Sequence, residues 1–385
     1  MRILRTIRSV NPEGGGPIEG IIQVSRALNE LGHRVEMLSL DTPEDSWVRN
    51  SSLKIHARGR GGRNYGYAPE FVRWLRRHQD DYDAIIVSGL WQFHSYGVWQ
   101  ALRGARVPYF VFPHGMLDPW FKRAHPLKHL KKWLYWPWAE YRVLRDARAV
   151  LFTCDEERRL ARESFWLYRC NERVVNYGTA APPADRWWQK ATFLEQFPEL
   201  RSRRVVLFLG RLHAKKGCDV LLRAFHVFES EQREQGDDSW HLVLAGPDQD
   251  GWQRQLEALA ARLKLIGRVT FTGMLRGELK WGAFRQAELF VLPSHQENFG
   301  IAVVEALACG VPVVVSTSVN IWREIVQDRA GWACAADAEE VCRALRQWAT
   351  MNTNERECFC HRAQGCFAGR FEIEQAALSL LAALQ

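Results

Sequence analysis

The chain has 385 residues, 47% of them hydrophobic, so it is too long for one ordinary core and suits two domains that together bury most of the sequence. It contains 52 Lys and Arg against 44 Asp and Glu, and the resulting net charge of +8 favours acidic partners such as nucleic acid, anionic lipid or phosphorylated small molecules. The absence of zinc-finger spacing, of an RNP-like aromatic signature and of a basic tail argues against nucleic acid. The nine Cys are scattered, which indicates reduced thiols rather than a disulfide framework.

The first segments alternate between strand and helix patterns. Met1–Ile7 reads as a buried strand, Asn11–Pro17 as a glycine-rich loop, Ile18–Leu31 as a helix and His33–Leu40 as a second strand. At helical spacing, one face of this helix is formed by Ile18, Ile21, Ile22, Ser25, Leu28 and Leu31. This is a βαβ unit with a glycine-rich turn at the carboxyl end of its first strand.

The same alternation continues to the end of the chain. Further strands are expected at Ala84–Ser88, Pro108–Phe112, Ala149–Thr153, Arg204–Leu209, His241–Ala245, Arg268–Thr272, Leu289–Leu292 and Val311–Ser316, and a helix at Val220–Glu229. A Pro- and Ala-rich run near Gly178–Pro198 indicates a linker. The fold class is therefore α/β: two Rossmann-like, doubly wound parallel-sheet domains with an interdomain cleft.

We place the boundaries as follows: an N-terminal acceptor-side domain over 1–180, a linker over 181–200, a C-terminal domain over 201–370, and a helix over 371–385 that can pack back on the N-terminal domain. The N-terminus is too quickly interrupted by Gly and Pro to be a signal peptide, and no run of about 18 uncharged apolar residues occurs. We therefore expect a cytoplasmic protein, with room for peripheral attachment to the inner face of the cytoplasmic membrane.

The strongest chemical signal is the segment from Pro293 to Gly310, which follows a predicted strand. Glu297 lies in the loop and Glu305 about two turns into the next helix, whose first N–H groups and positive dipole end face the ligand crevice. The two carboxylates can accept hydrogen bonds from sugar and ribose hydroxyls. The simpler interpretation is an amphipathic helix with a polar cap.

The second signal is the loop that follows the strand Arg204–Leu209. Arg211 and Lys216 place two cations at the carboxyl end of this strand, where they can stabilise the negative charge that develops on a departing diphosphate. Basic residues are also common in ordinary surface loops.

Together these motifs resemble the retaining glycosyltransferases of family 4, which have the GT-B fold. The resemblance rests on the E-x7-E pair before ACGVPVV, on GRLHAKKG, on the glycine loop NPEGGGPIEG, and on PHGMLDPW, which resembles a segment of bacterial exopolysaccharide and O-antigen members. It covers essentially the whole chain in the expected order. One departure is Asn176-Tyr177-Gly178, where many relatives have Pro-Asn-Gly.

The resemblance implies donor-binding roles in the C-terminal domain. Arg211 and Lys216 would hold the diphosphate, Glu297 the transferred sugar and Glu305 the ribose. The backbone of Asn298, Phe299 and Gly300 would face the sugar and phosphates.

In the N-terminal domain, Gly15 and Gly16 would approach the phosphates closely, as only residues without a side chain can. His114 matches the histidine proposed to lie by the donor sugar and acceptor. The implied catalytic set is His114, Arg211, Lys216 and Glu297.

The resulting expectation is transfer of a hexose from a UDP- or GDP-sugar to a hydroxyl of a lipid-linked glycan, such as a polyprenyl-diphosphate-linked one, in polysaccharide biosynthesis. No cofactor and no metal are expected, and Glu297 would be a positioning group rather than a nucleophile. Two alternatives remain open: a nucleotide-sugar epimerase, which shares the fold, and a catalytically silent subunit that binds sugar nucleotides.

Three groups of residues suggest metal sites and are interpreted otherwise. Asp81-Tyr82-Asp83 precedes its strand, Asp248-Gln249-Asp250 reads as a turn leading into a helix, and the cluster Cys358, Cys360, His361 and Cys366 has no standard zinc spacing.

The stretch Trp120–Arg148 interleaves Lys and Arg with Trp, Tyr and Phe. This composition suits an anionic membrane surface, but an ordinary domain face with buried Trp side chains gives the same pattern. Pro126 and Pro137 argue against one continuous helix.

Overall fold

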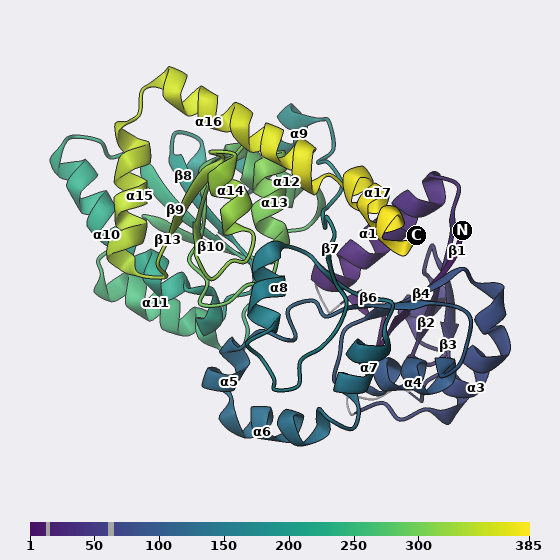
Figure 1. Ribbon diagram of the computed structural model, residues 1–385. Coiled ribbons are helices and arrows are strands. Elements are labelled where there is room, and N and C mark those ends of the chain that lie inside the picture. The colour runs from purple at the N-terminus through teal and green to yellow at the C-terminus, as the bar shows by residue number, and fades with distance from the viewer. Residues whose placement is uncertain (13–15, 61–64) are drawn as a thin grey trace. The chain divides into compact units, whose positions relative to one another are not determined.

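The computed structural model describes residues 1–12, 16–60 and 65–385. They form two compact units (Figure 1): Met1–Ala180 together with Glu372–Gln385, and Ala181–Phe371.

Within the described residues, the first unit is built on a seven-stranded parallel sheet in the order β3-β2-β1-β4-β5-β6-β7. Its strands are β1 (Arg2–Ile7), β2 (Arg34–Ser39), β3 (Lys54–Ala57), β4 (Ala84–Ser88), β5 (Tyr109–Phe112), β6 (Ala149–Phe152) and β7 (Glu172–Val174). The direction in which successive strands are added reverses between β1 and β4, which is the doubly wound arrangement. The central strands are buried along their length because helices cover both faces.

The helices of the first unit include one that comes from the far end of the chain. They are α1 (Gly16–Glu30), α2 (Ser46–Arg49), α3 (Pro69–His78), α4 (Phe93–Leu102), α5 (Trp120–Ala124), α6 (Pro126–Tyr135), α7 (Glu140–Asp146), α8 (Asp155–Ala161) and α17 (Ile373–Leu384). Ala377 and Leu380 of α17 share a buried cluster with Val24 and Leu28 of α1. The C-terminal helix is therefore part of the first unit.

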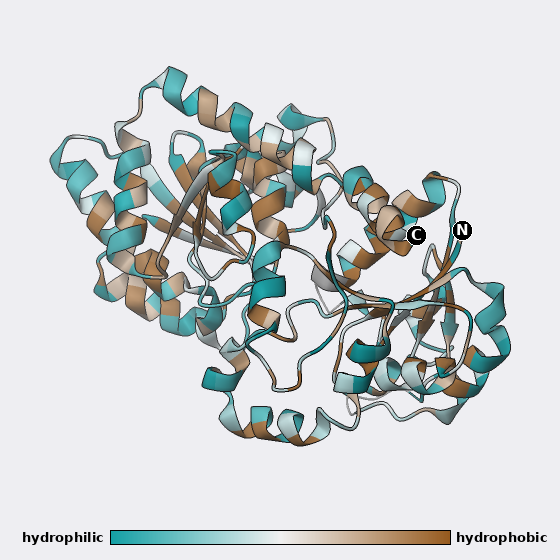
Figure 2. Ribbon diagram, viewed as in Figure 1, coloured by the Kyte–Doolittle hydropathy of each residue, from teal (hydrophilic) through white to brown (hydrophobic). Residues whose placement is uncertain are grey.

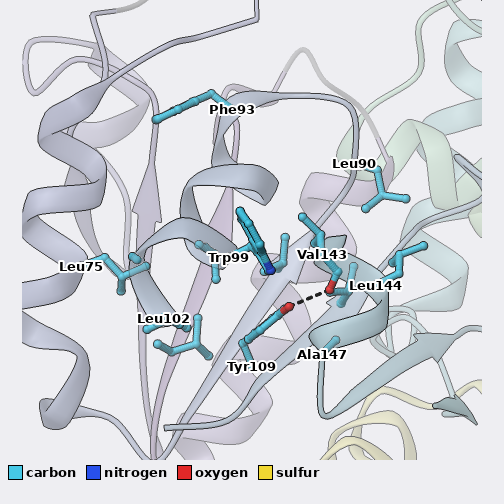
Figure 3. Packing of buried hydrophobic residues seen from close by; sticks show 14 of the residues in the cluster. Leu75, Leu90, Phe93, Trp99, Leu102, Tyr109, Val143, Leu144 and Ala147 are labelled. Atoms are coloured by element: carbon cyan, nitrogen blue, oxygen red, sulfur yellow. Dashed lines mark hydrogen bonds between the residues drawn. The ribbon is translucent and has the colours of Figure 1, made fainter. Parts of the chain in front are cut away.

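The core beneath α4 and α7 combines aliphatic and aromatic side chains (Figure 3). Two polar atoms in it are satisfied by specific partners. The Tyr109 hydroxyl donates to the Val143 carbonyl at 2.7 Å, and Trp99 Nε1 donates to the Asp146 carboxylate at 2.8 Å. These bonds fix α7 against β5 and α4, because an unsatisfied buried donor would cost about 1–3 kcal/mol.

The second unit repeats the same topology with six parallel strands among the described residues, in the order β10-β9-β8-β11-β12-β13. Its strands are β8 (Arg204–Leu209), β9 (Trp240–Ala245), β10 (Val269–Gly273), β11 (Ala287–Leu292), β12 (Val313–Ser316) and β13 (Gly331–Cys334). Its helices are α9 (Arg186–Gln196), α10 (Cys218–Glu234), α11 (Trp252–Arg262), α12 (Gly277–Gln286), α13 (Ile301–Ala308), α14 (Trp322–Gln327), α15 (Ala338–Thr350) and α16 (Thr353–Cys366).

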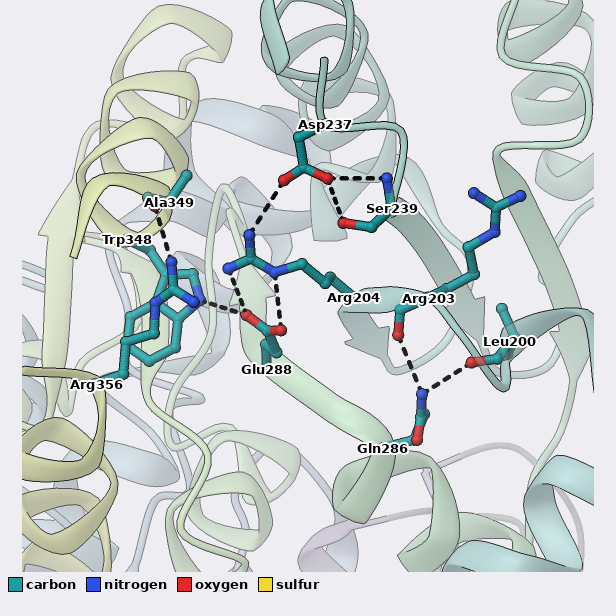
Figure 4. Close-up of polar contacts among 10 residues, drawn as sticks. All are labelled: Leu200, Arg203, Arg204, Asp237, Ser239, Gln286, Glu288, Trp348, Ala349 and Arg356. Atoms are coloured by element: carbon teal, nitrogen blue, oxygen red, sulfur yellow. Dashed lines mark hydrogen bonds and ion pairs between the residues drawn. The ribbon is translucent and has the colours of Figure 1, made fainter. Parts of the chain in front are cut away.

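A polar network ties the start of β8 to its neighbours (Figure 4). The Arg204 guanidinium makes two hydrogen bonds of 2.9 Å to Glu288 at the start of β11 and one of 3.2 Å to Asp237. It also lies over the Trp240 ring at 3.9 Å, and Trp348 Nε1 donates to Glu288. Because a bidentate Arg–carboxylate pair has a fixed geometry, this network aligns β8 with β11.

The predicted strands and helices are confirmed to within a few residues, with three kinds of difference. The prediction that Leu31 lies on the buried face of α1 is wrong: it is 44% exposed, and Val24 and Ala27 are buried instead. The predicted linker 181–200 contains α9, which packs on α12: a Cβ on Gly282 would lie 2.2 Å from the Gln189 carbonyl oxygen. Three strands (β3, β7 and β13) were not foreseen; they are only three or four residues long.

Candidate functional site

The two predicted donor-binding loops of the second unit follow neighbouring strands. One leaves β8 and leads through a short 3-10 turn, Ala214–Lys216, into α10, and the other leaves β11 and leads into α13. Strands β8 and β11 are adjacent, and the strand order reverses between them. Ligands of doubly wound sheets bind at this switch point, outside the carboxyl ends of the strands.

Backbone contacts hold the two loops against each other. His295 N–H donates to the Lys215 carbonyl at 2.8 Å. Gly217, the N-cap residue just before α10, has a φ of 70°, and a Cβ at this position would lie only 2.1 Å from the Pro293 carbonyl oxygen. This position therefore needs glycine both for its backbone conformation and for the close approach of the second loop.

Lys216 and Glu297 form an ion pair across these loops, and Lys216 Nζ donates to Glu297 Oε2. Their side chains are 15% and 20% exposed. Burial alone would raise the pKa of Glu297, but the charge and hydrogen bond of Lys216, with Lys215 and the Asn298 N–H, hold it below its ordinary value. Glu297 is thus an anion, and its backbone is held by Ser318 and Asn320 at 2.9 and 3.0 Å.

Glu305 forms a second ion pair, with a lysine that the sequence motifs did not single out. Lys280 Nζ donates to Glu305 Oε1 at 2.7 Å, and Lys280 Nζ also lies 4.1 Å from the centre of the Trp281 ring. The Glu305 side chain is only 9% exposed. Lys280 is on α12, in a different βα unit, so nothing in its sequence surroundings pointed to this partner.

The residues between the two carboxylates have different environments. Gly300 has a φ of 77° and precedes the first residue of α13, so the helix begins at Ile301. Phe299 is 5% exposed and its ring lies 5.7 Å from that of Phe371, while Asn298 Oδ1 accepts from Asn320 Nδ2 at 3.2 Å. The Phe299 side chain therefore belongs to the core, so a ligand could meet only its backbone.

Arg211 also follows β8, but its contact is with the loop after β9, the neighbour of β8 on the side away from β11. It is exposed, and its Nη1 donates to Gln249 Oε1 at 3.1 Å, in the loop that follows β9. Within the described residues, this hydrogen bond joins Arg211 to the β9 loop rather than to Lys216 or Glu297.

In the first unit, His114 follows β5 in the turn Pro113–Leu117 with a φ of 49°. Its ring stacks on Phe112 at 5.3 Å and meets the edge of Tyr177 at 5.8 Å. The next N–H, that of Gly115, donates to Glu157 at 2.6 Å. His114 Nε2 is buried and has no hydrogen-bond partner within the described ranges.

Of the two predicted glycines in this unit, Gly16 is the first residue of α1. Gly15 lies outside the described residues.

Lowering the pH should reduce the free energy of unfolding of the first unit, because two of its histidines are buried. Burial lowers the pKa of His94 to about 4, and burial with the charge of Arg5 lowers that of His114 to about 3. An unfolded histidine titrates near 6.5, so below that pH the unfolded chain binds protons that the folded unit does not. Each histidine should then cost up to ~1.4 kcal/mol of unfolding free energy per pH unit, until pH falls through its folded pKa.

The measurement is hydrogen exchange of the β4 and β5 peptides between pH 7 and 5, corrected for intrinsic rates, in wild type and His94→Gln. Glu140, whose pKa burial raises to about 7, has the opposite effect, since its folded carboxyl group takes up protons first. The difference between the two proteins therefore isolates His94, and a substitution at the exposed His125 is the control. Equal pH slopes in wild type and His94→Gln would contradict the prediction.

The three groups that resemble metal sites are placed as follows. Asp81 and Asp83 precede β4, at the opposite edge from the carboxyl ends. Asp248 Oδ1 accepts from the Gln253 N–H at 2.9 Å and so caps the turn into α11. The cluster of Cys358, Cys360, His361 and Cys366 lies along α16, and no group of three or more possible ligands that could hold a metal occurs in the described part of the chain.

Comparison with known proteins identifies related domains in both units. The model for the glycosyl transferase 4-like domain matches residues 15–178, and the model for glycosyl transferases group 1 matches residues 190–364. Mannosylfructose-phosphate synthase of Agrobacterium fabrum is 26% identical over 349 residues, which are 82% of this chain and 74% of that protein.

Solved structures resemble the whole chain. Sucrose-phosphate synthase of Thermosynechococcus elongatus matches with a TM-score of 0.79 at 20% identity, over 99% of this chain and 98% of that one. HepE of Anabaena in complex with UDP matches with a TM-score of 0.78 at 18% identity, over 100% and 99% of the two chains. The chain therefore belongs to the glycosyltransferases that combine a 4-like domain with a group 1 domain, and its two parallel-sheet units have the GT-B fold.

Proposed function

We propose that this protein is a retaining glycosyltransferase of family 4 that moves a hexose from a nucleotide diphosphate sugar to a hydroxyl of a lipid-linked glycan. The observation that carries the proposal is the Lys216–Glu297 ion pair at the switch point of the second sheet. A cation and an anion side by side suit a donor whose diphosphate is negative and whose sugar presents hydroxyl donors.

In this proposal Lys216 and Arg211 hold the diphosphate and neutralise the charge that develops as the bond to the anomeric carbon breaks. Glu297 accepts hydrogen bonds from the transferred sugar. Its depressed pKa keeps it an acceptor near neutral pH. Glu305, oriented by Lys280, accepts from the ribose hydroxyls.

His114 would assist on the acceptor side as a neutral ring, because its lowered pKa prevents protonation near neutral pH. In front-face transfer, the departing phosphate oxygen takes the proton of the acceptor hydroxyl, and the acceptor oxygen bonds to the anomeric carbon on the face that the diphosphate leaves. No side chain then has to act as a nucleophile.

We propose that the nucleotide of the donor sugar is UDP, with GDP as the alternative. HepE of Anabaena has been solved with UDP and with UDP-glucose. For the acceptor, we propose a polyprenyl-diphosphate-linked glycan of polysaccharide biosynthesis, which would bring the enzyme to the inner face of the cytoplasmic membrane. No helix in the described ranges is long and apolar enough to cross a membrane.

A thermal-shift screen of UDP-, GDP- and ADP-sugars tests the donor. We expect a UDP-sugar at a hundred times its dissociation constant to stabilise the protein by ~2.7 kcal/mol, since it binds only the folded state. Incubation with that donor and a polyprenyl-linked acceptor should then give a product whose anomeric configuration, measured by NMR, matches the donor.

Other outcomes would favour the alternatives. Epimerisation of UDP-N-acetylglucosamine without an acceptor would indicate an epimerase. Binding without transfer or hydrolysis would indicate a silent subunit, and an inverted product would exclude the retaining mechanism.

A further inference from the structure

The helix α6 turns its apolar residues outward. Leu127, Leu130 and Leu134 recur at helical spacing on one stripe and are 78%, 55% and 61% exposed. None of the ten residues of α6 is buried. A helix on the surface of a globular domain normally places such a stripe against the core.

The residues of α6 that face the unit are polar or aromatic. His129 stacks on Phe165 at 4.8 Å, and Tyr135 contacts Tyr65 through their hydroxyls. Lys132 Nζ lies 4.6 Å from the centre of the Trp91 ring, and burial lowers its pKa to about 8. The usual amphipathic order is thus inverted, with a lysine inside and three leucines outside. In Figure 2, hydrophobic and hydrophilic residues interleave along α6.

Further exposed apolar residues adjoin this stripe. The Trp133 ring, on α6, lies 5.7 Å from that of Trp166, which is 48% exposed; the adjacent Leu167 is 50% exposed. Trp138, just after α6, is 69% exposed. By contrast Trp136, which the sequence placed in the same basic and aromatic set, is fully buried and donates to the Trp166 carbonyl at 2.8 Å.

The apolar stripe is bordered by positive charge. Lys122 and Arg123 on α5 and Lys128 and Lys131 on α6 are exposed. No Asp or Glu occurs between Pro119 and Ala139. A second protein surface could cover leucines, but the basic border on α5 and α6, which carry no carboxylate, favours a partner that is both apolar and anionic.

We infer that this α6 surface, formed by Leu127, Leu130, Trp133, Leu134, Trp138, Trp166 and Leu167, docks on an anionic phospholipid bilayer. The leucines and tryptophans enter the boundary between headgroups and acyl chains, and the lysines of α5 and α6 meet the lipid phosphates. The inference deepens the proposed function by assigning a surface that could meet a lipid-linked acceptor. The docking itself requires neither donor nor acceptor.

The test is sedimentation of the full chain with vesicles of phosphatidylglycerol and phosphatidylcholine, or of phosphatidylcholine alone. We expect binding to the mixed vesicles that falls as salt is raised, and at least about tenfold weaker binding to the neutral ones. Leu127→Gln/Leu130→Gln/Leu134→Gln should weaken binding at least about tenfold. Lys128→Gln/Lys131→Gln should weaken it about fivefold per charge, on the anionic vesicles only.

Ile266→Gln is the matched control, because Ile266 is 82% exposed but belongs to the second unit and to none of the elements that form this surface. It should bind vesicles like wild type. Since the three leucines are exposed, their replacement should leave the circular dichroism spectrum and donor binding unchanged.

Vesicle binding by the triple variant equal to that of wild type would overturn the inference, as would failure of wild type to bind anionic vesicles. A dimer in light scattering that the triple variant converts to a monomer would assign the surface to a second copy instead. If the vesicles bind as expected but no sugar is transferred, the docking stands and the proposed function fails.

Discussion

Replacing Lys216 by Ala is expected to lower kcat for sugar transfer about a thousandfold while the protein remains folded. Removing one group that stabilises developing negative charge costs ~10²–10³ in rate, and Lys216 carries a full charge in a site where it is only 15% exposed. The same change removes the partner of Glu297. Burial then acts on Glu297 without the opposing charge of Lys216, so the pKa of Glu297 rises and its carboxylate is held less firmly as an anion.

Steady-state kinetics of three further variants separate these effects. Lys216→Arg keeps the charge and should recover part of the rate, whereas Glu297→Gln keeps the shape but loses the anion and should reduce kcat strongly. Lys215→Ala, in the same loop, is the matched control and should retain most of the activity. Near-wild-type transfer by both Lys216→Ala and Glu297→Gln would refute the assignment of this site.

Gly217→Ala is expected to destabilise the second unit by about 2–5 kcal/mol and to reduce transfer sharply. An alanine at a φ of 70° costs ~1–2 kcal/mol by itself, and its Cβ would lie 2.1 Å from the Pro293 carbonyl oxygen. The overlap adds ~1–3 kcal/mol and pushes the two loops apart, which separates Lys216 from Glu297.

The other end of the same helix provides the control. Gly236, just after α10, has a φ of 89°, but a Cβ there would have no neighbour within 4 Å. Gly236→Ala should therefore cost only the ~1–2 kcal/mol of backbone strain and leave transfer unchanged. Urea denaturation and initial rates of both variants test this. Equal losses in the two would show that loop contact is not the reason for glycine at position 217.

Much of the fold could be predicted because its signals are local. Buried parallel strands are continuous apolar runs, and the six-residue β8 was located to the residue. The E-x7-E segment and the Arg/Lys loop were recognisable because their residues are close in sequence. Short edge strands such as β3 and β7, with partly exposed residues, give no such signal.

Other features depend on residues that only the tertiary structure brings together. Lys216 is 81 positions from Glu297, and the two meet because β8 and β11, which are separated in sequence, are neighbours in the sheet. Lys280 is 25 positions from Glu305, and this pair joins α12 to α13, the helices before and after β11.

The sequence of α6 has the periodicity of an amphipathic helix, but this periodicity is the same whichever side faces inward. Packing of His129, Lys132 and Tyr135 against the unit decided that the leucines face outward. By itself, then, the sequence determined the elements, their order and the chemical character of the loops, because these depend on neighbouring residues. Which cation meets which carboxylate, and which face of a helix is left uncovered, depended on long-range packing.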